Sequence, residues 1–281
     1  MLVSETILQQ TQISRGGPAW VRFTSQFPTL ESLAEASPAA VLRAWQGLGY
    51  NRRAINLQRA ARIIVGELLG VFPTAVPDLE RLPGIGPYTA RAVASIAFQR
   101  PVGAVDTNVR RVIGRVLAGS PTALGARLLQ DAADELVDPT QPDDWTHALM
   151  DIGSTLCRPA RPLCPDCPVR EVCRYAAGDR PDPARTTSAT DEGQPGQIIS
   201  RTEFKHTTRW LRGRILDQLR DAPGDAWTAF SEPIGEHDLA SVDASLRAME
   251  REGLLELEPP ALEPPANGSS RRPARARLPI A

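Results

Sequence analysis

Apolar residues recur along the first 178 positions with the three-to-four-residue spacing of amphipathic helices. Clear stripes of this kind cover residues 41–45, 57–68, 90–97 and 109–116. The first follows Ser37-Pro38, an N-cap residue and a proline suited to the first helical position. Alternating β patterns and Asn-Gly hairpin signals do not occur in this stretch. The pattern predicts an all-α fold for residues 1–178.

The pattern changes after residue 178. Residues 179–202 are rich in Pro, Gly, Ser, Thr and charged side chains, which predicts a linker. Helical spacing returns at 207–219 and 239–249, followed by a short alternating run. We therefore expect a small winged-helix-like module at 203–258. Residues 259–281 are rich in proline and arginine and are expected to form a disordered basic tail.

Composition narrows the class of protein. The 281 residues carry 32 basic and 33 acidic side chains, which excludes a polycation or an acidic disordered chain. Residues 1–115 hold 13 arginines against 7 acids, whereas residues 116–150 hold one arginine against six. This asymmetry fits either a basic binding face or ordinary solvated helix surfaces. No apolar run is long enough to span a bilayer and no secretory signal is evident, so we expect a cytoplasmic protein.

The segment Leu82-Pro83-Gly84-Ile85-Gly86 lies between a short predicted helix and a longer one. Gly84 and Gly86 allow a tight turn that exposes backbone N–H groups at a helix start, where they can hold a phosphate. The segment resembles the helix-hairpin-helix motif of DNA-binding proteins. An ordinary turn between two helices would use similar residues, and the motif reports only sequence-independent contact.

All four cysteines, Cys157, Cys164, Cys167 and Cys173, fall within 17 residues. A disulfide framework would usually tie distant segments together, so a metal site is the better interpretation. Four thiolates in one compact loop can enclose an iron–sulfur cubane. Zinc remains the alternative, although it more often uses two paired C-x₂-C knuckles.

Asp106 lies 18 residues after Tyr88, at the start of the next predicted helix. An aspartate there is also an ordinary N-cap. Beside a helix-hairpin-helix, however, this spacing is similar to that of the DNA glycosylase superfamily that contains the motif. Bifunctional members have a nucleophilic lysine at the position of Tyr88. The only lysine of this chain is Lys205, outside the helical region, which excludes a lysine-based lyase.

Four segments in order, residues 4–12, 47–50, 82–90 and 106–109, resemble the MutY-type adenine DNA glycosylases over roughly residues 1–178. The resemblance implies a two-lobed fold, with a glycosylase lobe at 1–117 and an iron–sulfur lobe at 118–178. It implies that Glu5 protonates N7 of an extruded adenine while Asp106 stabilises the cationic sugar. Tyr88 and Asn108 would line the pocket.

The same resemblance assigns further contacts. Gln10 and Tyr50 would wedge into the duplex around the opposite base. The four cysteines would hold a [4Fe-4S] cluster, and the partner would be double-stranded DNA carrying a mismatch or an oxidised guanine. We expect a monomer associated with the nucleoid. Without that resemblance, Glu5 would be a dipole-complementing residue of a first helical turn, Gln10 a surface residue and Tyr50 a core residue.

The chain departs from the family pattern at several points. Thr107 replaces a glycine and Asn51 a second tyrosine of many members. An N-terminal segment with a Trp-Arg element is missing, and we expect the true start to lie upstream of Met1. Residues 203–258 are too short and too helical for the usual Nudix-like domain.

Three functions therefore stand side by side. The leading hypothesis is a monofunctional glycosylase that removes adenine mispaired with guanine or 8-oxoguanine. The others are a T:G or U:G mismatch glycosylase and a non-catalytic iron–sulfur DNA-binding protein. Base release from defined duplexes separates the first two, and substitution of Glu5 or Asp106 separates both from the third.

Overall fold

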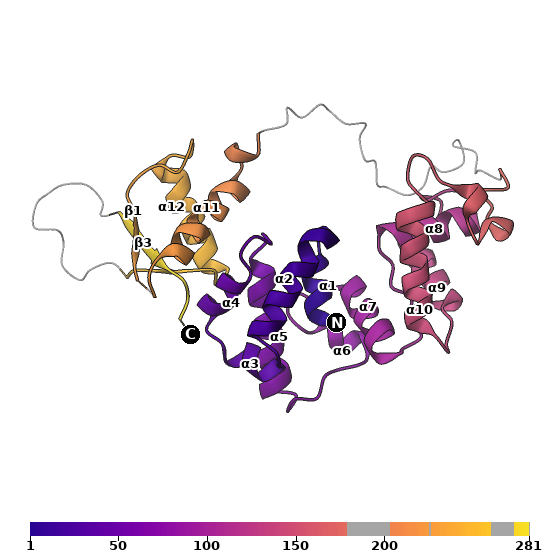
Figure 1. Ribbon diagram of the computed structural model, residues 1–281, viewed down its shortest axis with the longest axis horizontal. Helices are drawn as coiled ribbons and strands as arrows, with labels where there is room; N and C mark the ends of the chain where they lie inside the picture. The colour runs from indigo at the N-terminus through magenta and orange to yellow at the C-terminus, as the bar shows by residue number, and fades with distance from the viewer. Residues whose placement is uncertain (179–202, 225, 260–272, 281) are drawn as a thin grey trace, which may run out of the picture. The chain divides into compact units, whose positions relative to one another are not determined.

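The computed structural model describes residues 1–178, 203–224, 226–259 and 273–280. The chain divides into two compact units (Figure 1). Residues 1–5 and 72–193 form the first unit, and residues 6–71 and 194–281 form the second. The predicted boundaries at residues 117 and 118 are therefore wrong. The hairpin helices pack with α10 of the cysteine-bearing segment, so they belong to the same unit as the cysteines.

Helices build the first unit, apart from its share of α1 (Leu2–Leu8). Buried Ser95 joins two of them, because its hydroxyl lies 2.8 Å from both the Pro142 carbonyl and the Thr146 hydroxyl. Val109, Ile113, Leu129 and Ala133 form a buried cluster. The helices are α6 (Val76–Glu80), α7 (Pro87–Phe98), α8 (Thr107–Ala118), α9 (Ala126–Leu136) and α10 (Pro142–Asp151), then π-helical η1 (Ile152–Leu156) and the 3₁₀ turns η2 (Cys164–Asp166) and η3 (Arg170–Val172).

The second unit begins with α2 (Ile13–Gln26), α3 (Leu30–Glu35), α4 (Pro38–Ala44) and α5 (Arg52–Gly66). Ser37 caps α4 by accepting a hydrogen bond from the Ala40 amide, as its sequence predicts. Phe23 and Trp45 are fully buried, and their rings meet edge to face with centroids 5.5 Å apart. The apolar stripes of α4 and α5 form this core.

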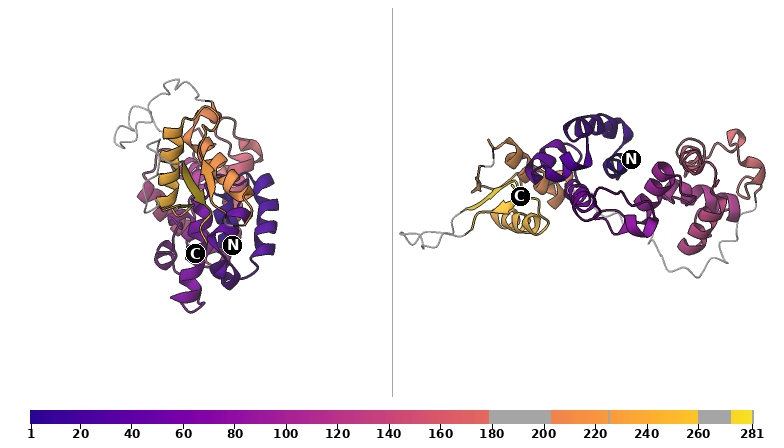
Figure 2. Two further views of the ribbon diagram at one scale, coloured as in Figure 1. Left: turned by 90° about the vertical axis from the view of Figure 1, so that its left-hand side faces the viewer. Right: turned by 90° about the horizontal axis from the view of Figure 1, so that it is seen from below.

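The C-terminal part of the second unit contains the 3₁₀ turn η5 (Phe204–His206), α11 (Thr208–Asp221) and α12 (Leu239–Arg251). These two helices lie beside a small antiparallel sheet (Figure 2). Its strands are β1 (Thr228–Phe230), β2 (Glu256–Leu257) and β3 (Ala274–Arg277), in the order β1-β3-β2. Thr228 pairs with Ala276, and Glu256 with Arg277.

The central strand β3 corrects the prediction of a disordered tail, because residues 273–280 are ordered into the sheet. Ala276 and Leu278 alternate with arginines and are almost completely buried. Arg275 and Arg277 form ion pairs with Glu258 and Glu256, at 2.9 and 2.8 Å. The proline-rich composition concealed this two-residue alternation. The predicted linker at 179–202 and residues 260–272 of the predicted tail lie outside the described residues.

The C-terminal helices also pack onto the N-terminal helices of the second unit. Arg220, whose side chain is 5% exposed, donates to the Leu42 carbonyl at 3.0 Å and to Asn51 Oδ1 at 2.8 Å. Arg43 donates to the Gly224 carbonyl at 2.6 Å. The segment predicted as a separate module is thus part of one compact unit. In the described part of the chain, no helix is both long and apolar enough to cross a bilayer.

Candidate active site

The predicted hairpin lies between α6 and α7 of the first unit. Gly84 has φ = 79°, a left-handed conformation that a residue with a side chain rarely adopts. Leu82 and Ile85 are buried, and the Ile85 amide donates to the Leu82 carbonyl at 3.2 Å. Gly86 is the N-cap of α7, and Pro87 occupies the first helical position. The turn therefore keeps its apolar residues inside and leaves Gly84 and Gly86 exposed at the start of a helix.

Glu5 and Tyr88 come together in the first unit, although 83 positions separate them. Glu5 lies in the first turn of α1 and shares a side-chain hydrogen bond with Tyr88 near the start of α7. Burial raises the pKa of Glu5, partly offset by that hydrogen bond, and the Asp106 charge adds a small upward contribution. Burial also raises the pKa of the Tyr88 phenol, followed by the Glu5 and Asp106 charges. Glu5 is therefore biased toward its neutral, proton-donating form.

Asp106 is held as an anion in a fixed orientation. It is the N-cap of α8, where Oδ1 accepts a hydrogen bond from the Val109 amide at 2.7 Å. Its second oxygen, Oδ2, accepts from Asn108 Nδ2 at 3.1 Å. Two donors and a helix N-terminus all favour the charged carboxylate. The N-cap role and the predicted catalytic role thus apply to the same side chain.

Arg111 links Asn108 to the segment that leads into the cysteines. Its Nη2 donates to Asn108 Oδ1 at 2.8 Å and to the Gly153 carbonyl at 2.6 Å. Its Nε donates to the Cys157 carbonyl at 2.6 Å. Because Asn108 Oδ1 accepts from Arg111, its amide nitrogen is turned toward Asp106. One arginine therefore fixes the amide that holds the candidate catalytic carboxylate.

Gly153 allows η1 and α8 to approach each other closely. A Cβ atom on Gly153 would lie 2.6 Å from Asn108 Cβ and 3.2 Å from the Asn108 backbone carbonyl carbon. Gly153 itself is buried. Only a residue without a side chain fits here, so the position of Asn108 depends on this glycine.

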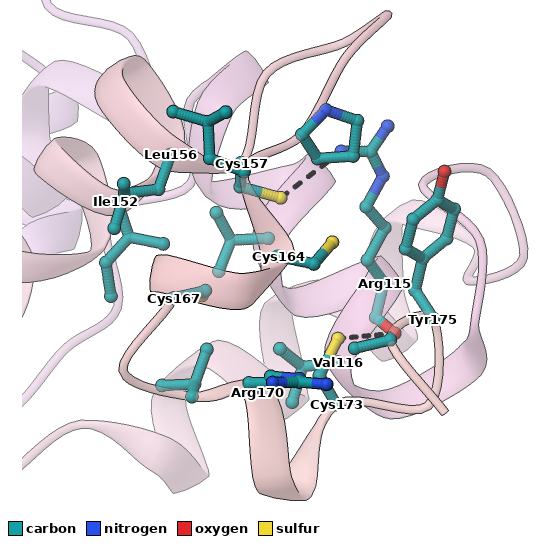
Figure 3. Close-up of a pocket in the computed structure, with 15 residues that line it drawn as sticks. Arg115, Val116, Ile152, Leu156, Cys157, Cys164, Cys167, Arg170, Cys173 and Tyr175 are labelled. Atoms are coloured by element: carbon teal, nitrogen blue, oxygen red, sulfur yellow. Dashed lines mark hydrogen bonds between the residues drawn. The ribbon is translucent and has the colours of Figure 1, made fainter. Parts of the chain in front are cut away.

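The four cysteines line one pocket of the first unit (Figure 3). Cys157, Cys164 and Cys173 turn their sulfurs toward the same space, and Cys167 completes the lining. The rest of the wall is largely apolar, including Val112, Ile152, Leu156 and Leu163. Burial raises the pKa of Cys167, and the other three thiols add to this effect. Among the described residues, no three His, Cys, Asp or Glu side chains gather closely enough to hold a metal ion.

Arg115 of α8 connects this pocket to its surroundings. Its Nη1 lies 3.3 Å from Cys157 Sγ and 2.8 Å from the Arg158 carbonyl, and its Nη2 donates to the Pro159 carbonyl at 2.8 Å. The guanidinium also lies 4.6 Å from the centre of the Tyr175 ring. A buried cation beside a cysteine sulfur favours the thiolate form, which is the form that binds metal.

Gln10 and Tyr50, the predicted wedge residues, belong to the second unit, and both have exposed side chains. Gln10 follows the end of α1, and Tyr50 ends the loop before α5. Arg209 of α11 lies over the Tyr50 ring, with its guanidinium carbon 4.1 Å from the ring centre. Its Nη1 donates to the Tyr50 hydroxyl at 2.9 Å. The prediction that residues 203–258 are a separate module gave no reason to expect this contact.

Sequence reasoning missed the arginines that organise these sites. Arg111 and Arg115 follow Asn108 on α8 at helical spacing, so each could have been flagged as facing the same side as a predicted site residue. Their carbonyl acceptors lie more than 40 positions away, which no local pattern encodes. Figure 3 shows Arg115 reaching the cysteine pocket.

Comparisons with known proteins agree with this geometry. Residues 3–139 match the HhH-GPD superfamily of base excision DNA repair proteins. The adenine DNA glycosylase of Mycolicibacterium smegmatis is 38% identical over 258 residues, covering 91% of this chain and 83% of the relative. The adenine DNA glycosylase of Rattus norvegicus is 47% identical over 176 residues, covering 61% of this chain but 34% of the relative. This chain therefore spans about a third of the rat protein.

A solved structure supports the fold. A thermostable thymine-DNA glycosylase is 28% identical and superposes with a TM-score of 0.59, covering 63% of this chain and 83% of that structure. The fold and the hairpin define a helix-hairpin-helix base excision repair glycosylase. Within that class, the chain belongs to the family of MutY-type adenine DNA glycosylases, and it is a hydrolase of N-glycosyl compounds.

Proposed function

We propose that this enzyme removes adenine paired with guanine or 8-oxoguanine from double-stranded DNA by hydrolysis alone. The observation that carries the proposal is the pairing of two carboxyl groups with opposite preferences in one unit. Burial favours protonated Glu5, whereas two donors and a helix N-terminus favour ionised Asp106. Pairs of acids with pKa values pushed apart are typical of enzymes that cleave glycosidic bonds.

The proposed reaction starts when Glu5 donates its proton to N7 of the extruded adenine. The N-glycosidic bond then breaks, both of its electrons leave with the base, and the base departs neutral. Asp106 stabilises the positive charge that develops on the sugar. Water adds its oxygen to C1′ and loses a proton to the medium or to the Glu5 carboxylate. Tyr88 and Asn108 orient the two carboxyl groups through the contacts described above.

The absence of a lysine near this cluster supports a monofunctional enzyme. Lys205, the only lysine of the chain, lies in the second unit, whereas Glu5 and Asp106 lie in the first. Borohydride reduction during turnover should therefore trap no covalent protein–DNA complex. A trapped complex would contradict the monofunctional reaction.

We further propose that Cys157, Cys164, Cys167 and Cys173 hold a [4Fe-4S] cluster. Four cysteines around a shared, apolar-walled pocket fit a cluster of several atoms, and Arg115 stabilises the Cys157 thiolate. When bound, the cluster would brace this loop and place positive charge behind it. The exposed side chains of Arg158, Arg161, Arg170 and Arg174 are proposed to meet DNA phosphates. Iron and sulfide analysis tests the assignment, and stoichiometric zinc would contradict it.

The proposed DNA contacts divide between the units. Gly84 and Gly86 would hold a phosphate at the start of α7, and Gln10 and Tyr50 would enter the duplex around the opposite base. The winged-helix-like arrangement of α11, α12 and the sheet is proposed as part of the same DNA-binding surface, because Arg209 contacts Tyr50. The protein is proposed to act as a monomer.

Base release from duplexes carrying A:8-oxoG, A:G, T:G or U:G tests the substrate. We expect adenine release from the first two only. The likeness to a thymine-DNA glycosylase keeps a T:G enzyme as the second candidate, and thymine or uracil release alone would establish it.

Glu5→Gln and Asp106→Asn should each lower the single-turnover rate by about 10²-fold or more, while DNA binding survives. Glu80→Gln, which changes an exposed carboxylate of the same unit, is the matched control. If Glu5→Gln and Asp106→Asn retain the rate of this control, the two-carboxylate reaction is wrong. If wild-type protein loaded with its cluster releases no base at all, the non-catalytic DNA-binding alternative replaces it.

A further inference from the structure

Two residues of the second unit carry backbone strain that their own side chains do not explain. Gln10 has φ = 56° and Tyr50 has φ = 45°, both in the left-handed region that non-glycine residues avoid. Such a conformation costs roughly 1–3 kcal/mol per residue and persists only where surrounding contacts impose it. Both side chains are exposed, so their packing does not compensate for this cost. Another group must hold the backbone.

Arg53, in the first turn of α5, supplies those contacts. Its guanidinium donates hydrogen bonds to two chain segments at once. Nη1 donates to the carbonyls of Thr6, at 2.8 Å, Ile7, at 3.1 Å, and Gln9; Nη2 donates to those of Leu48, at 3.1 Å, and Gly49, at 3.2 Å. Gln9 and Gly49 are the residues immediately before Gln10 and Tyr50. One side chain therefore fixes the peptide plane that precedes each strained residue.

The surroundings of Arg53 show that these carbonyls are its main partners. Among the described residues, it forms no ion pair with a carboxylate within 4 Å. Its charge instead meets the C-terminal carbonyls of α1, where a cation complements the helix dipole. Trp45 strengthens the same loop, because its Nε1 donates to the Gly49 carbonyl at 3.1 Å. The Arg53 guanidinium carbon lies 5.4 Å from the centre of the Trp45 ring.

We propose that Arg53 is a positioning residue that holds Gln10 and Tyr50 in strained conformations, so that both side chains are ready to enter the duplex before DNA binds. The inference rests on the proposed function, in which these two residues separate the extruded adenine from its partner. Arg53 acts through the backbone and contacts no base. A preformed wedge lowers the cost of ordering that would otherwise accompany base extrusion.

Arg53→Lys is the informative substitution. Lysine keeps the positive charge but presents its donors from a single nitrogen, whereas the planar fork of arginine reaches both segments. Arg62→Lys is the matched control. Arg62 lies on the same helix and donates to the Ala34 and Ala36 carbonyls, at 2.9 and 3.3 Å, but neither acceptor precedes a residue with positive φ.

The experiment compares single-turnover adenine release from two duplexes. In one, adenine lies opposite guanine; in the other, it lies opposite a tetrahydrofuran abasic analogue, where no partner base must be separated. We expect Arg53→Lys to slow release from the A:G duplex by about 10- to 100-fold, the scale of a misplaced contact, and to change the second substrate by less than about threefold. Arg62→Lys should change neither rate. An equal loss on both duplexes would overturn the proposal, because Arg53 would then support the whole site.

Two further measurements keep the proposal testable if Arg53→Lys folds poorly or if wild-type protein releases no adenine. Tyr50→Gly should melt at a higher temperature than Tyr50→Ala, since glycine adopts φ = 45° without strain. The opposite order would show that no strain is stored. Fluorescence of 2-aminopurine in place of adenine reports unstacking without chemistry. Wild-type protein should raise this signal and Arg53→Lys should raise it less, whereas equal signals would refute the role of Arg53.

Discussion

Gly153→Ala tests whether the packing between η1 and α8 controls the candidate catalytic aspartate. Gly153 does not have a positive φ, so alanine is compatible with its backbone and only space opposes it. The new Cβ would lie 2.6 Å from Asn108 Cβ and 3.2 Å from the Asn108 carbonyl carbon. These atoms belong to the first turn of a helix and cannot swing away as a flexible side chain can. We therefore expect η1 and α8 to move apart.

The size of the effect follows from this overlap. The separation must grow from 2.6 Å to at least 3.0 Å, a shift of 0.4 Å or more. Overpacking of this kind costs about 1–3 kcal/mol, which corresponds to a fall in melting temperature of roughly 2–12 °C for a domain of this size. The shift also strains the 2.6 Å bond from Arg111 to the Gly153 carbonyl, and with it the orientation of Asn108 toward Asp106. Because a misplacement of about 1 Å can cost about 10²-fold in rate, we expect adenine release to fall about tenfold.

Thermal melting and single-turnover release measure the two effects on the same preparations. Gly125→Ala is the control, since a Cβ on Gly125 meets no atom within 4 Å and the residue lies in the same unit. It should leave the rate unchanged. If Gly153→Ala matches Gly125→Ala in both melting temperature and rate, the helix positions are not limited by this contact. If only stability falls, the link from η1 to Asp106 is wrong.

Three further predictions concern the same cluster. Activity that needs protonated Glu5 should fall as the pH rises through its raised pKa; Tyr88→Phe removes a hydrogen bond that lowers this pKa, so the alkaline limb of the pH–rate profile should move to higher pH, and an unmoved limb would contradict this. Since the folded pKa of Glu5 lies above its unfolded value, stability is lost as the pH rises between the two; Glu5→Gln should therefore raise the melting temperature at neutral pH but not in acid, and no difference at either pH would refute the buried-carboxylate argument. Arg111→Met should lower both melting temperature and rate because it leaves Asn108 Oδ1 and two carbonyls without their donor, whereas Arg127→Met, at a 95% exposed side chain, should change neither.

Local sequence patterns predicted much of the secondary structure and the chemistry-bearing residues. The glycine-rich turn lies between α6 and α7 as expected, and Asp106 caps α8. Both depend on interactions between near neighbours: a left-handed glycine, and a side-chain oxygen that meets an amide three positions on. The four cysteines line one pocket because their spacing already confined them to one loop.

Patterns hidden by composition led to wrong predictions. The proline- and arginine-rich C-terminus concealed a strand, because Ala276 and Leu278 were weighed as members of a polar tail rather than as alternate positions of one face. The helical lobes were divided at residue 117 since no local signal shows that α7 packs on α10. Both errors arise where long-range packing decides the outcome.

The sequence by itself determined which helices form, which residues can donate or hold a proton, and that no lysine near them can act as a nucleophile. These are properties of single residues and short spacings. Only the tertiary structure decided that Glu5 is buried against Tyr88, that Arg111 orients Asn108, and that Arg53 joins the carbonyls before Gln10 and Tyr50. Each of these depends on a guanidinium or a carboxyl group meeting partners far away in the chain, and desolvation and hydrogen-bond geometry exist only once those segments have packed together.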